Sequence, residues 1–326
     1  MSRSLFTLLI LLALAAPFVV LGQVYDGFAG NIILALTPEF PRPNEKVTVA
    51  LSGFSVDVTR AEISWSLNGV LLKKGVGARE VSFVAGALGS NTALVVTVES
   101  PFQGNYRETL SVRPAEVDIL WKTDGYLPPF YKGKALPTPQ APITLVAMPA
   151  LVAASGKLLA PETLVYEWRQ DGRALSDKSG FGKQSIAIEG PRGFQDTIVS
   201  VAVSSFDKSI KAEKTIVLDA FQPKIVFYEK HPLRGVLYER AIGDRFALEK
   251  EEVVLRAEPY FFPEGAVASG VLDFSWVVND QRVFSEKQTE LALRKEGEAG
   301  GTSSVRLEIK DLRHLVQAVV ALLIQF

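Results

Sequence analysis

A short phrase built around tryptophan occurs three times in this 326-residue chain, at intervals of roughly a hundred residues. In each copy an Asn or Asp lies three residues after the tryptophan and begins a turn-like pair. The copies are ISWSLNGVLL (Ile63–Leu72), YEWRQDGRAL (Tyr166–Leu175) and FSWVVNDQRV (Phe274–Val283). Self-similarity at a nearly fixed period is the signature of repeated structural units. The phrase therefore predicts three units of similar fold.

The segments around the phrase repeat as well. The residue 29 or 30 positions after each tryptophan lies in an alternating segment, and these segments are Ala93–Ser100, Thr197–Ser205 and Ser304–Asp311. Apolar and polar residues alternate there with a period of two, which indicates strands with one buried face. About 100 residues per repeat is a normal size for a β-sandwich. We therefore expect an all-β fold of three sandwich domains, at 23–115, 116–220 and 221–326.

The phrases WSLNGVLL and WRQDGRAL resemble strand C and the following turn of immunoglobulin-like domains. Bacterial immunoglobulin-like and PKD-like surface modules have a similar arrangement. The chain departs from antibody-type domains because it contains no cysteine, and it lacks the acidic Gly-Asp-Gly signature of many PKD repeats. The resemblance implies tandem β-sandwich modules of an exported surface protein, and it leaves the choice between the two subfamilies open.

The tryptophans are candidate core residues. In Ile63–Leu67 the residues Ile63, Trp65 and Leu67 would share one face of a strand, and both serines would share the other. A strand-C tryptophan packed between two sheets is a hallmark of such sandwiches. We expect Trp65, Trp168 and Trp276 to be structural core residues. The alternative is an exposed aromatic platform for a ligand.

The N-terminus has the pattern of a secretory signal peptide. Arg3 provides a positive charge, an apolar stretch runs from Leu5 to Ala16 with Thr7 as its one polar residue, and small residues precede a cut after Gly22. The alternative is an uncleaved membrane anchor. Either interpretation predicts an exported protein, located in the periplasm, at the cell surface or outside the cell.

Few chemical functions fit the composition. A net charge of −1 and the absence of a basic stripe argue against nucleic acid as a partner. The two histidines, His231 and His314, have no metal-spaced or catalytic partner nearby in the sequence. Calcium binding at loops that contain Asp124, Asp219 or Asp244 is an alternative, but no Asp-x-Asp cluster supports it. We expect no enzyme activity, no catalytic residue, no cofactor and no metal.

Two proline-containing stretches, 113–136 and 221–242, parallel each other between the repeats. We interpret each as the first strand of a domain followed by a connector. The alternative is a functional loop with exposed aromatic side chains. The candidate interaction residues are Tyr126, Phe130, Tyr131 and Tyr238, with Lys132 and Lys134 adjacent.

The C-terminal stretch LVQAVVALLIQF (315–326) is expected to form the last strand of the third domain, paired with Ser304–Asp311. It is nearly all apolar, and a long apolar edge invites association. The pattern predicts self-association through this strand.

The leading functional hypothesis is a non-catalytic exported protein, in which the modules act as a spacer, a scaffold or an adhesive surface. A protein or an envelope polymer is the expected partner. The first alternative is a carbohydrate- or envelope-polymer-binding protein. The second is a hydrolase or an assembly chaperone with a sandwich fold, since a fold alone never decides function.

Overall fold

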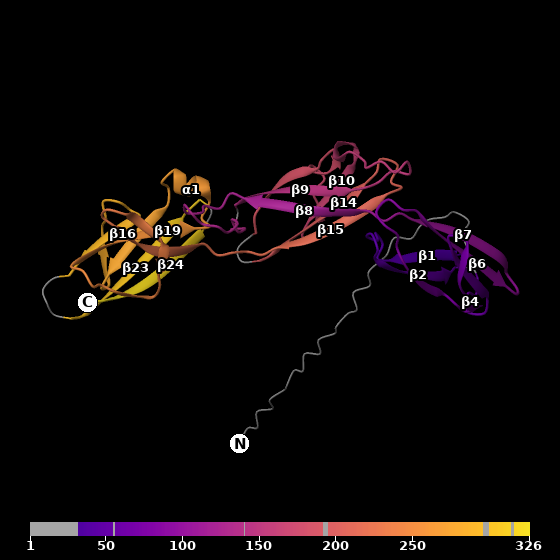
Figure 1. Cartoon of the computed structure of the whole chain (residues 1–326), viewed down its shortest axis with the longest axis horizontal. Coiled ribbons are helices and arrows are strands. Elements are labelled where there is room, and N and C mark those ends of the chain that lie inside the picture. Colours follow the sequence, from indigo (N-terminus) through magenta and orange to yellow (C-terminus); the bar gives the residue numbers. More distant parts are fainter. Residues whose placement is uncertain (1–31, 55, 140, 192–194, 296–299, 314–315) are drawn as a thin grey trace, which may run out of the picture. The chain divides into compact units, whose positions relative to one another are not determined.

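The computed structural model describes residues 32–54, 56–139, 141–191, 195–295, 300–313 and 316–326 (Figure 1). The expected signal peptide and His314 lie outside these residues. Within them, the helical elements are a 3₁₀ turn at Pro161–Thr163 and the short helix α1 (Glu264–Ala268), and the remaining regular elements are β-strands. The chain divides into two compact units, Met1–Pro114 and Ala115–Phe326.

The first unit holds one sandwich of two antiparallel sheets. One sheet has the order β1 (Ile32–Thr37), β2 (Lys46–Gly53), β5 (Glu80–Val84). The other has the order β4 (Val70–Val76), β3 (Glu62–Leu67), β6 (Thr92–Ser100), β7 (Gly104–Val112). Alternate side chains of the two sheets are buried and form one apolar core around Trp65.

The second unit begins with a sandwich of the same strand order. Its first sheet is β13 (Ser185–Glu189), β9 (Pro142–Ala150), β8 (Glu116–Thr123). Its second sheet is β11 (Arg173–Ala174), β10 (Val165–Gln170), β14 (Thr197–Ser204), β15 (Lys211–Leu218), and β12 (Gly180–Phe181) also pairs with β10. The apolar core lies around Trp168.

The same unit continues with a third sandwich, which has two additional strands. One sheet is β17 (Gly235–Ile242), β16 (Lys224–His231), β19 (Glu252–Tyr260), β22 (Glu290–Arg294). The other is β18 (Arg245–Ala247), β24 (Val316–Gln325), β23 (Thr302–Asp311), β20 (Asp273–Val278), β21 (Gln281–Val283). Strand β18 pairs with β24 in parallel, and the other pairs are antiparallel. Three sandwiches with one shared strand order confirm the predicted all-β fold of tandem immunoglobulin-like modules. The exact domain limits stay predictions.

Each repeated tryptophan lies in the centre of its core. Trp65 and Trp168 are fully buried and Trp276 is 2% exposed. A buried indole N–H needs an acceptor, and each Nε1 donates to a backbone carbonyl ahead of the next strand of the facing sheet. The acceptors are Ala78, at 2.7 Å, and Lys183 and Gln288, both at 2.8 Å. The tryptophan thus joins its own sheet to the opposite one.

The turn after each tryptophan is also built in the same way. Asn68, Asp171 and Asn279 have φ of 50°, 49° and 50°, a left-handed conformation that Asn and Asp tolerate. The next residue is also left-handed, including Asp280 with φ of 62°. Loss of glycine in the third copy therefore leaves the turn conformation unchanged.

The two proline-containing stretches differ in structure. Residues 124–139 belong to the loop between β8 and β9, which pair in one sheet of the second sandwich, so the interpretation of residues 124–136 as a connector between domains was wrong. In the other stretch, β16 and β17 form a hairpin, and Tyr238 lies on β17. The interpretation of 231–242 as a connector was therefore wrong, because its residues add a strand to the sheet.

The last strand, β24, pairs with β23 along its whole length, as expected. Val316, Ala318, Leu322 and Ile324 point into the core. Most of the apolar character of this strand thus reflects burial within its own sandwich, while Val319 on the other face is half exposed.

Candidate functional site

The stretch that follows β8, which we call the connecting segment (124–136), lies against the third sandwich. The Tyr126 N–H donates to the Phe262 carbonyl at 2.6 Å, and the Phe261 N–H donates to the Tyr126 carbonyl at 2.9 Å. The Glu264 N–H donates to the Asp124 carbonyl at 2.9 Å. These bonds form a short antiparallel contact between segments that are more than 130 residues apart in sequence.

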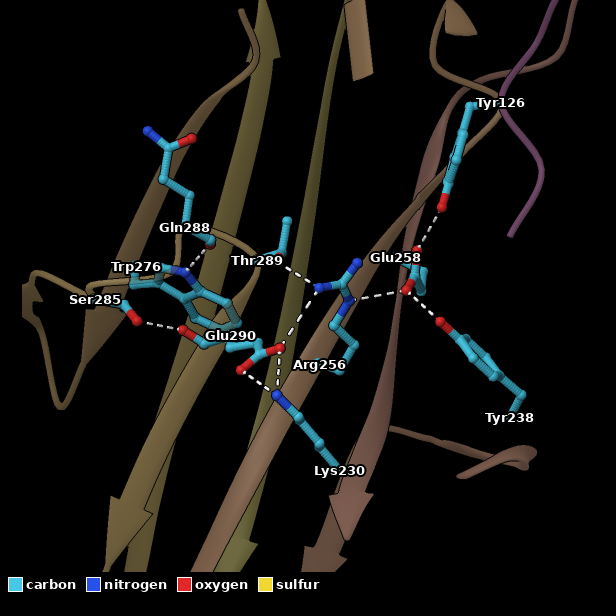
Figure 2. Close-up of polar contacts among 10 residues, drawn as sticks. All are labelled: Tyr126, Lys230, Tyr238, Arg256, Glu258, Trp276, Ser285, Gln288, Thr289 and Glu290. Atoms are coloured by element: carbon cyan, nitrogen blue, oxygen red, sulfur yellow. Dashed lines mark hydrogen bonds and ion pairs between the residues drawn. The ribbon is translucent and has the colours of Figure 1, made fainter. Parts of the chain in front are cut away.

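A buried carboxylate lies beside this contact. Glu258, on β19, has no solvent exposure. Its Oε2 accepts a hydrogen bond from the Tyr126 hydroxyl at 3.0 Å, and its Oε1 accepts bonds from the Tyr238 hydroxyl at 2.8 Å and Arg256 Nε at 2.9 Å (Figure 2). A buried charge is tolerated when it is paired and hydrogen-bonded. Three donors from three segments meet this requirement.

The charges continue along the sheet in alternating order. Arg256 donates to Thr289 Oγ1 at 2.7 Å and lies 3.6 Å from Glu290 Oε1. Lys230 Nζ donates to both carboxylate oxygens of Glu290 at 2.8 Å (Figure 2). The four ionic side chains of this charged network, Lys230, Glu290, Arg256 and Glu258, are therefore balanced in sign.

Burial and these contacts shift the pKa values of Tyr126, Tyr238 and Glu290. Burial, together with the negative charge of Glu258, raises the pKa of Tyr126 to about 12. Burial and the bond to Glu258 also raise the pKa of Tyr238. Burial alone would raise the pKa of Glu290, but the hydrogen bonds and charge of Lys230 outweigh it and lower that pKa. Both tyrosines are therefore neutral donors at physiological pH.

Aromatic rings gather next to this network. Tyr228 and Tyr260 are buried, and their hydroxyl groups lie 2.5 Å apart. The Tyr131 ring meets Tyr260 edge-on with centroids 5.5 Å apart, and the Phe130 ring lies 6.0 Å from Tyr238. These are the separations at which aromatic pairs attract. Rings from the connecting segment thus cover rings of β16, β17 and β19.

A surface pocket of about 350 Å³, which we call the aromatic pocket, lies among these rings. Its lining includes the rings of Phe130, Tyr131, Tyr228, Tyr238 and Tyr260 and the side chains of Lys132 and Lys224. The remaining lining residues are proline, valine and alanine. Phe130 is 83% exposed. The pocket therefore offers apolar ring surface and positive charge, and no carboxylate lines it.

The structure brings together all four candidate interaction residues. Phe130, Tyr131 and Tyr238 line the pocket, and Tyr126 binds Glu258, which Tyr238 also binds. Sequence reasoning missed the residues contributed by β16 and β19, which are Lys224, Tyr228, Arg256, Glu258 and Tyr260. A signal was present in LRAEPYFF (255–262), where an acidic residue precedes three aromatic residues on a strand that is otherwise apolar at alternate positions.

The other candidates lie elsewhere. The three repeated tryptophans are in the cores. His231 Nδ1 accepts hydrogen bonds from the backbone of Leu233 and Arg234, and so it stabilises the β16–β17 turn. The described residues contain no group of three or more His, Cys, Asp or Glu placed to hold a metal ion. No helix in the described ranges is long and apolar enough to cross a membrane.

Comparisons with known proteins find similarity of this chain to solved structures alone, at low sequence identity and low TM-score. No family model and no curated protein matches it. It is similar to the three N-terminal domains of the bacteriophage RB49 outer capsid protein Hoc, with 10% identity, 90% of this chain and 97% of that chain covered, and a TM-score of 0.27. It is also similar to Sidekick-1 immunoglobulin domains 1–5, with 11% identity, 88% of this chain and 56% of that chain covered, and a TM-score of 0.27. A further similarity is to the central fibronectin-III array of RIM-binding protein, with 11% identity, 90% of this chain and 95% of that chain covered, and a TM-score of 0.28. The assignment of tandem sandwiches rests on the strand order and cores described above.

Proposed function

We propose that this array of tandem immunoglobulin-like sandwiches is a non-catalytic, exported protein of the bacterial cell surface or envelope, which acts as a spacer, a scaffold or an adhesive surface. One observation carries the proposal. Every sandwich repeats the same buried tryptophan, with its indole bonded to the opposite sheet, and the same left-handed turn. Modules built alike around separate cores are suited to presenting several separate surfaces rather than to assembling one deep reaction centre.

The N-terminal pattern supports export. Arg3, the apolar stretch Leu5–Ala16, and Val20 and Gly22 at the −3 and −1 positions of a cut after Gly22 have the order of a signal peptide. The absence of cysteine means that the modules need no oxidising enzyme to fold after export.

Cell fractionation tests this proposal. The full chain and a form that lacks residues 2–22 are produced in a bacterium and detected with an antibody against the sandwiches. We expect the full chain in the exported fractions, where added protease degrades it, and the shortened form in the cytoplasm. Retention of both forms in the cytoplasm would overturn the proposal.

A second candidate function is binding of a carbohydrate or envelope polymer, and the aromatic pocket favours it. Phe130 and Tyr131 present exposed rings beside two lysines, an arrangement typical of ligand sites rather than of a spacer surface. Sedimentation with insoluble cell-wall polysaccharide tests this function. We expect the wild-type chain in the pellet and the Phe130→Ala variant in the supernatant, whereas equal behaviour of the two forms would contradict binding through the pocket.

A further inference from the structure

We infer that the aromatic pocket binds a sugar residue that carries a negative charge, as part of a polysaccharide with carboxylate, sulfate or phosphate groups. This inference rests on the second proposed function and names its ligand class. The occupant would place its ring against Phe130 and Tyr131 and its anionic group between Lys132 and Lys224.

The backbone at the pocket is strained in an unusual way. Eight non-glycine residues among the described ones have positive φ, and six are Asn, Asp or Lys. The other two are Phe130 (φ 68°) and Phe261 (φ 64°), both beside the pocket. A bulky residue seldom adopts this conformation, and such strain persists where the surroundings impose it, often at ligand sites. With this backbone conformation the largely exposed ring of Phe130 lies next to Tyr238.

The charge of the pocket is not compensated by its neighbours. Lys132 and Lys224 have no ion-pair partner among the described residues, whereas Lys230 is paired with Glu290. Lys224 Nζ lies 5.5 Å from the Tyr260 ring centre and 5.9 Å from that of Phe261, held by cation–π attraction. Because the charged network that Tyr238 contacts is balanced, the two lysines make the pocket positive. Charge complementarity therefore favours an anionic occupant.

Ring chemistry and size favour a sugar over an acidic peptide. The face of an aromatic ring is negative and attracts the weakly positive C–H groups on the face of a sugar ring. A volume of about 350 Å³ is at the lower end of the range for small-ligand sites, roughly 300–1,000 Å³. Recognition of a peptide commonly uses a sheet edge or a groove along several residues. The pocket is suited to one or two sugar units.

Calorimetry with the purified full chain tests the inference. The probes are tetragalacturonate, a neutral galactose tetramer and a tetraglutamate peptide, each at low and high salt. The variants are Phe130→Ala and the double change Lys132→Met with Lys224→Met. The controls are Phe284→Ala, which removes a 91% exposed ring elsewhere on the third sandwich, and Lys157→Met, which removes an exposed charge on the second.

We expect tetragalacturonate to bind, with an affinity that falls as salt rises because exposed charges are screened. Each pocket variant should lose roughly tenfold in affinity, and the control variants should match wild type. Equal binding of the neutral tetramer would overturn the role of the lysines, and equal binding of the peptide would overturn the sugar assignment. Absence of binding by all three probes, or unchanged affinity of the pocket variants, would overturn the inference. Loss of pelleting by Phe130→Ala in the sedimentation experiment, together with binding of the neutral tetramer alone in this one, would keep the second proposed function and overturn the anionic ligand class, so the two failures are distinguishable.

Discussion

The Asp171 carboxylate accepts a hydrogen bond from the backbone N–H of Ile198 at 2.9 Å, and the Asp171 N–H donates to the carbonyl of Ile198 at 2.8 Å. Asn68 makes the same two bonds with Ala93, and Asn279 makes them with Ser304. The turn after each repeated tryptophan is thereby attached to the neighbouring strand. This explains why an Asn or Asp occupies this position in all three phrases.

Replacement of Asp171 by Ala should destabilise the second sandwich by about 1–3 kcal/mol, because Ala is strained at positive φ and the Ile198 N–H loses its acceptor. Asp171→Asn is the matched control, since its amide oxygen can accept the same bond and Asn tolerates the conformation. Hydrogen exchange of the β14 amides measures the effect locally. Equal exchange in the Ala and Asn variants would contradict the assigned role of the side chain.

Truncation of a repeated tryptophan should lower the free energy of unfolding more than the Asp171→Ala substitution does. Trp168→Ala leaves a cavity in the second core and should cost roughly 3–5 kcal/mol. Trp168→Phe keeps much of the volume but leaves the Lys183 carbonyl without its donor, so a smaller loss of about 1–3 kcal/mol is expected. Urea unfolding, monitored by hydrogen exchange of the β10 and β14 amides, distinguishes the Ala variant from the Phe variant. A nearly neutral Ala variant would mean that Trp168 is not a core anchor.

Substitution of the buried Glu258 should lower stability far more than substitution of the exposed Glu239. Glu258→Gln leaves Arg256 without its fully buried partner, and breaking such a pair costs about 3–5 kcal/mol. Glu239→Gln breaks a pair with Arg234 in which both side chains are mostly exposed, so we expect a change within about 1 kcal/mol. Thermal unfolding of the third sandwich, monitored by hydrogen exchange of the β19 amides, measures the effect of both substitutions. Similar melting of the two variants would show that Glu258 is not paired as described.

Alkaline pH should weaken contact between the connecting segment and the third sandwich. The folded-state pKa of Tyr126 is about 12, above the ordinary value of 10.0. A raised pKa means that its stabilising effect is complete below pH 10 and is lost as pH rises from 10 towards 12. Stability measured against pH should therefore fall in this window for wild type and fall less for Tyr126→Phe. Identical slopes for the two proteins would argue against the Tyr126–Glu258 bond.

Deletion of Val316–Phe326 should unfold the third sandwich and leave the other cores protected. The deletion removes four buried apolar side chains. Burial of each of the three larger ones, Val316, Leu322 and Ile324, stabilises the fold by roughly 1.5–3 kcal/mol. Their sum approaches the whole free energy of unfolding of a typical domain. Hydrogen exchange measures this: the β23 amides should lose protection, and the β6 and β14 amides should keep it.

A substitution separates folding from the predicted self-association. Val319→Lys changes a half-exposed residue on the outer face of β24 and should leave the fold intact. If β24 joins two copies, sedimentation velocity should show a smaller species for this variant than for wild type. A folded deletion variant that lost only self-association would instead make β24 an added interaction element.

Much of the fold was predictable because its causes are local. A period of two in Ala93–Ser100 indicates a strand with one buried face, and Asn68-Gly69 indicates a sharp turn, since both depend on backbone sterics and on neighbouring residues. Strand β17 was not predictable in the same way. Its residues Gly235–Ile242 are mostly half buried or exposed, so they lack the alternation that marks a strand, and pairing with β16 makes them one.

The sequence by itself determined that the chain forms β-sandwiches with a tryptophan in each core, because a large ring at a buried strand position and a left-handed turn three residues later leave few alternatives. It also marked Tyr126, Phe130, Tyr131 and Tyr238 as aromatic residues in stretches between the repeats. Only the tertiary structure decided that Tyr126 and Tyr238 both bind Glu258 and that Phe130 and Tyr131 lie at the aromatic pocket. Their partners on β16 and β19 lie about a hundred residues or more from the connecting segment, and no local rule pairs an acid on one strand with a hydroxyl on another. Burial of that carboxylate requires donors from several segments at once, and the folded chain alone brings those segments together.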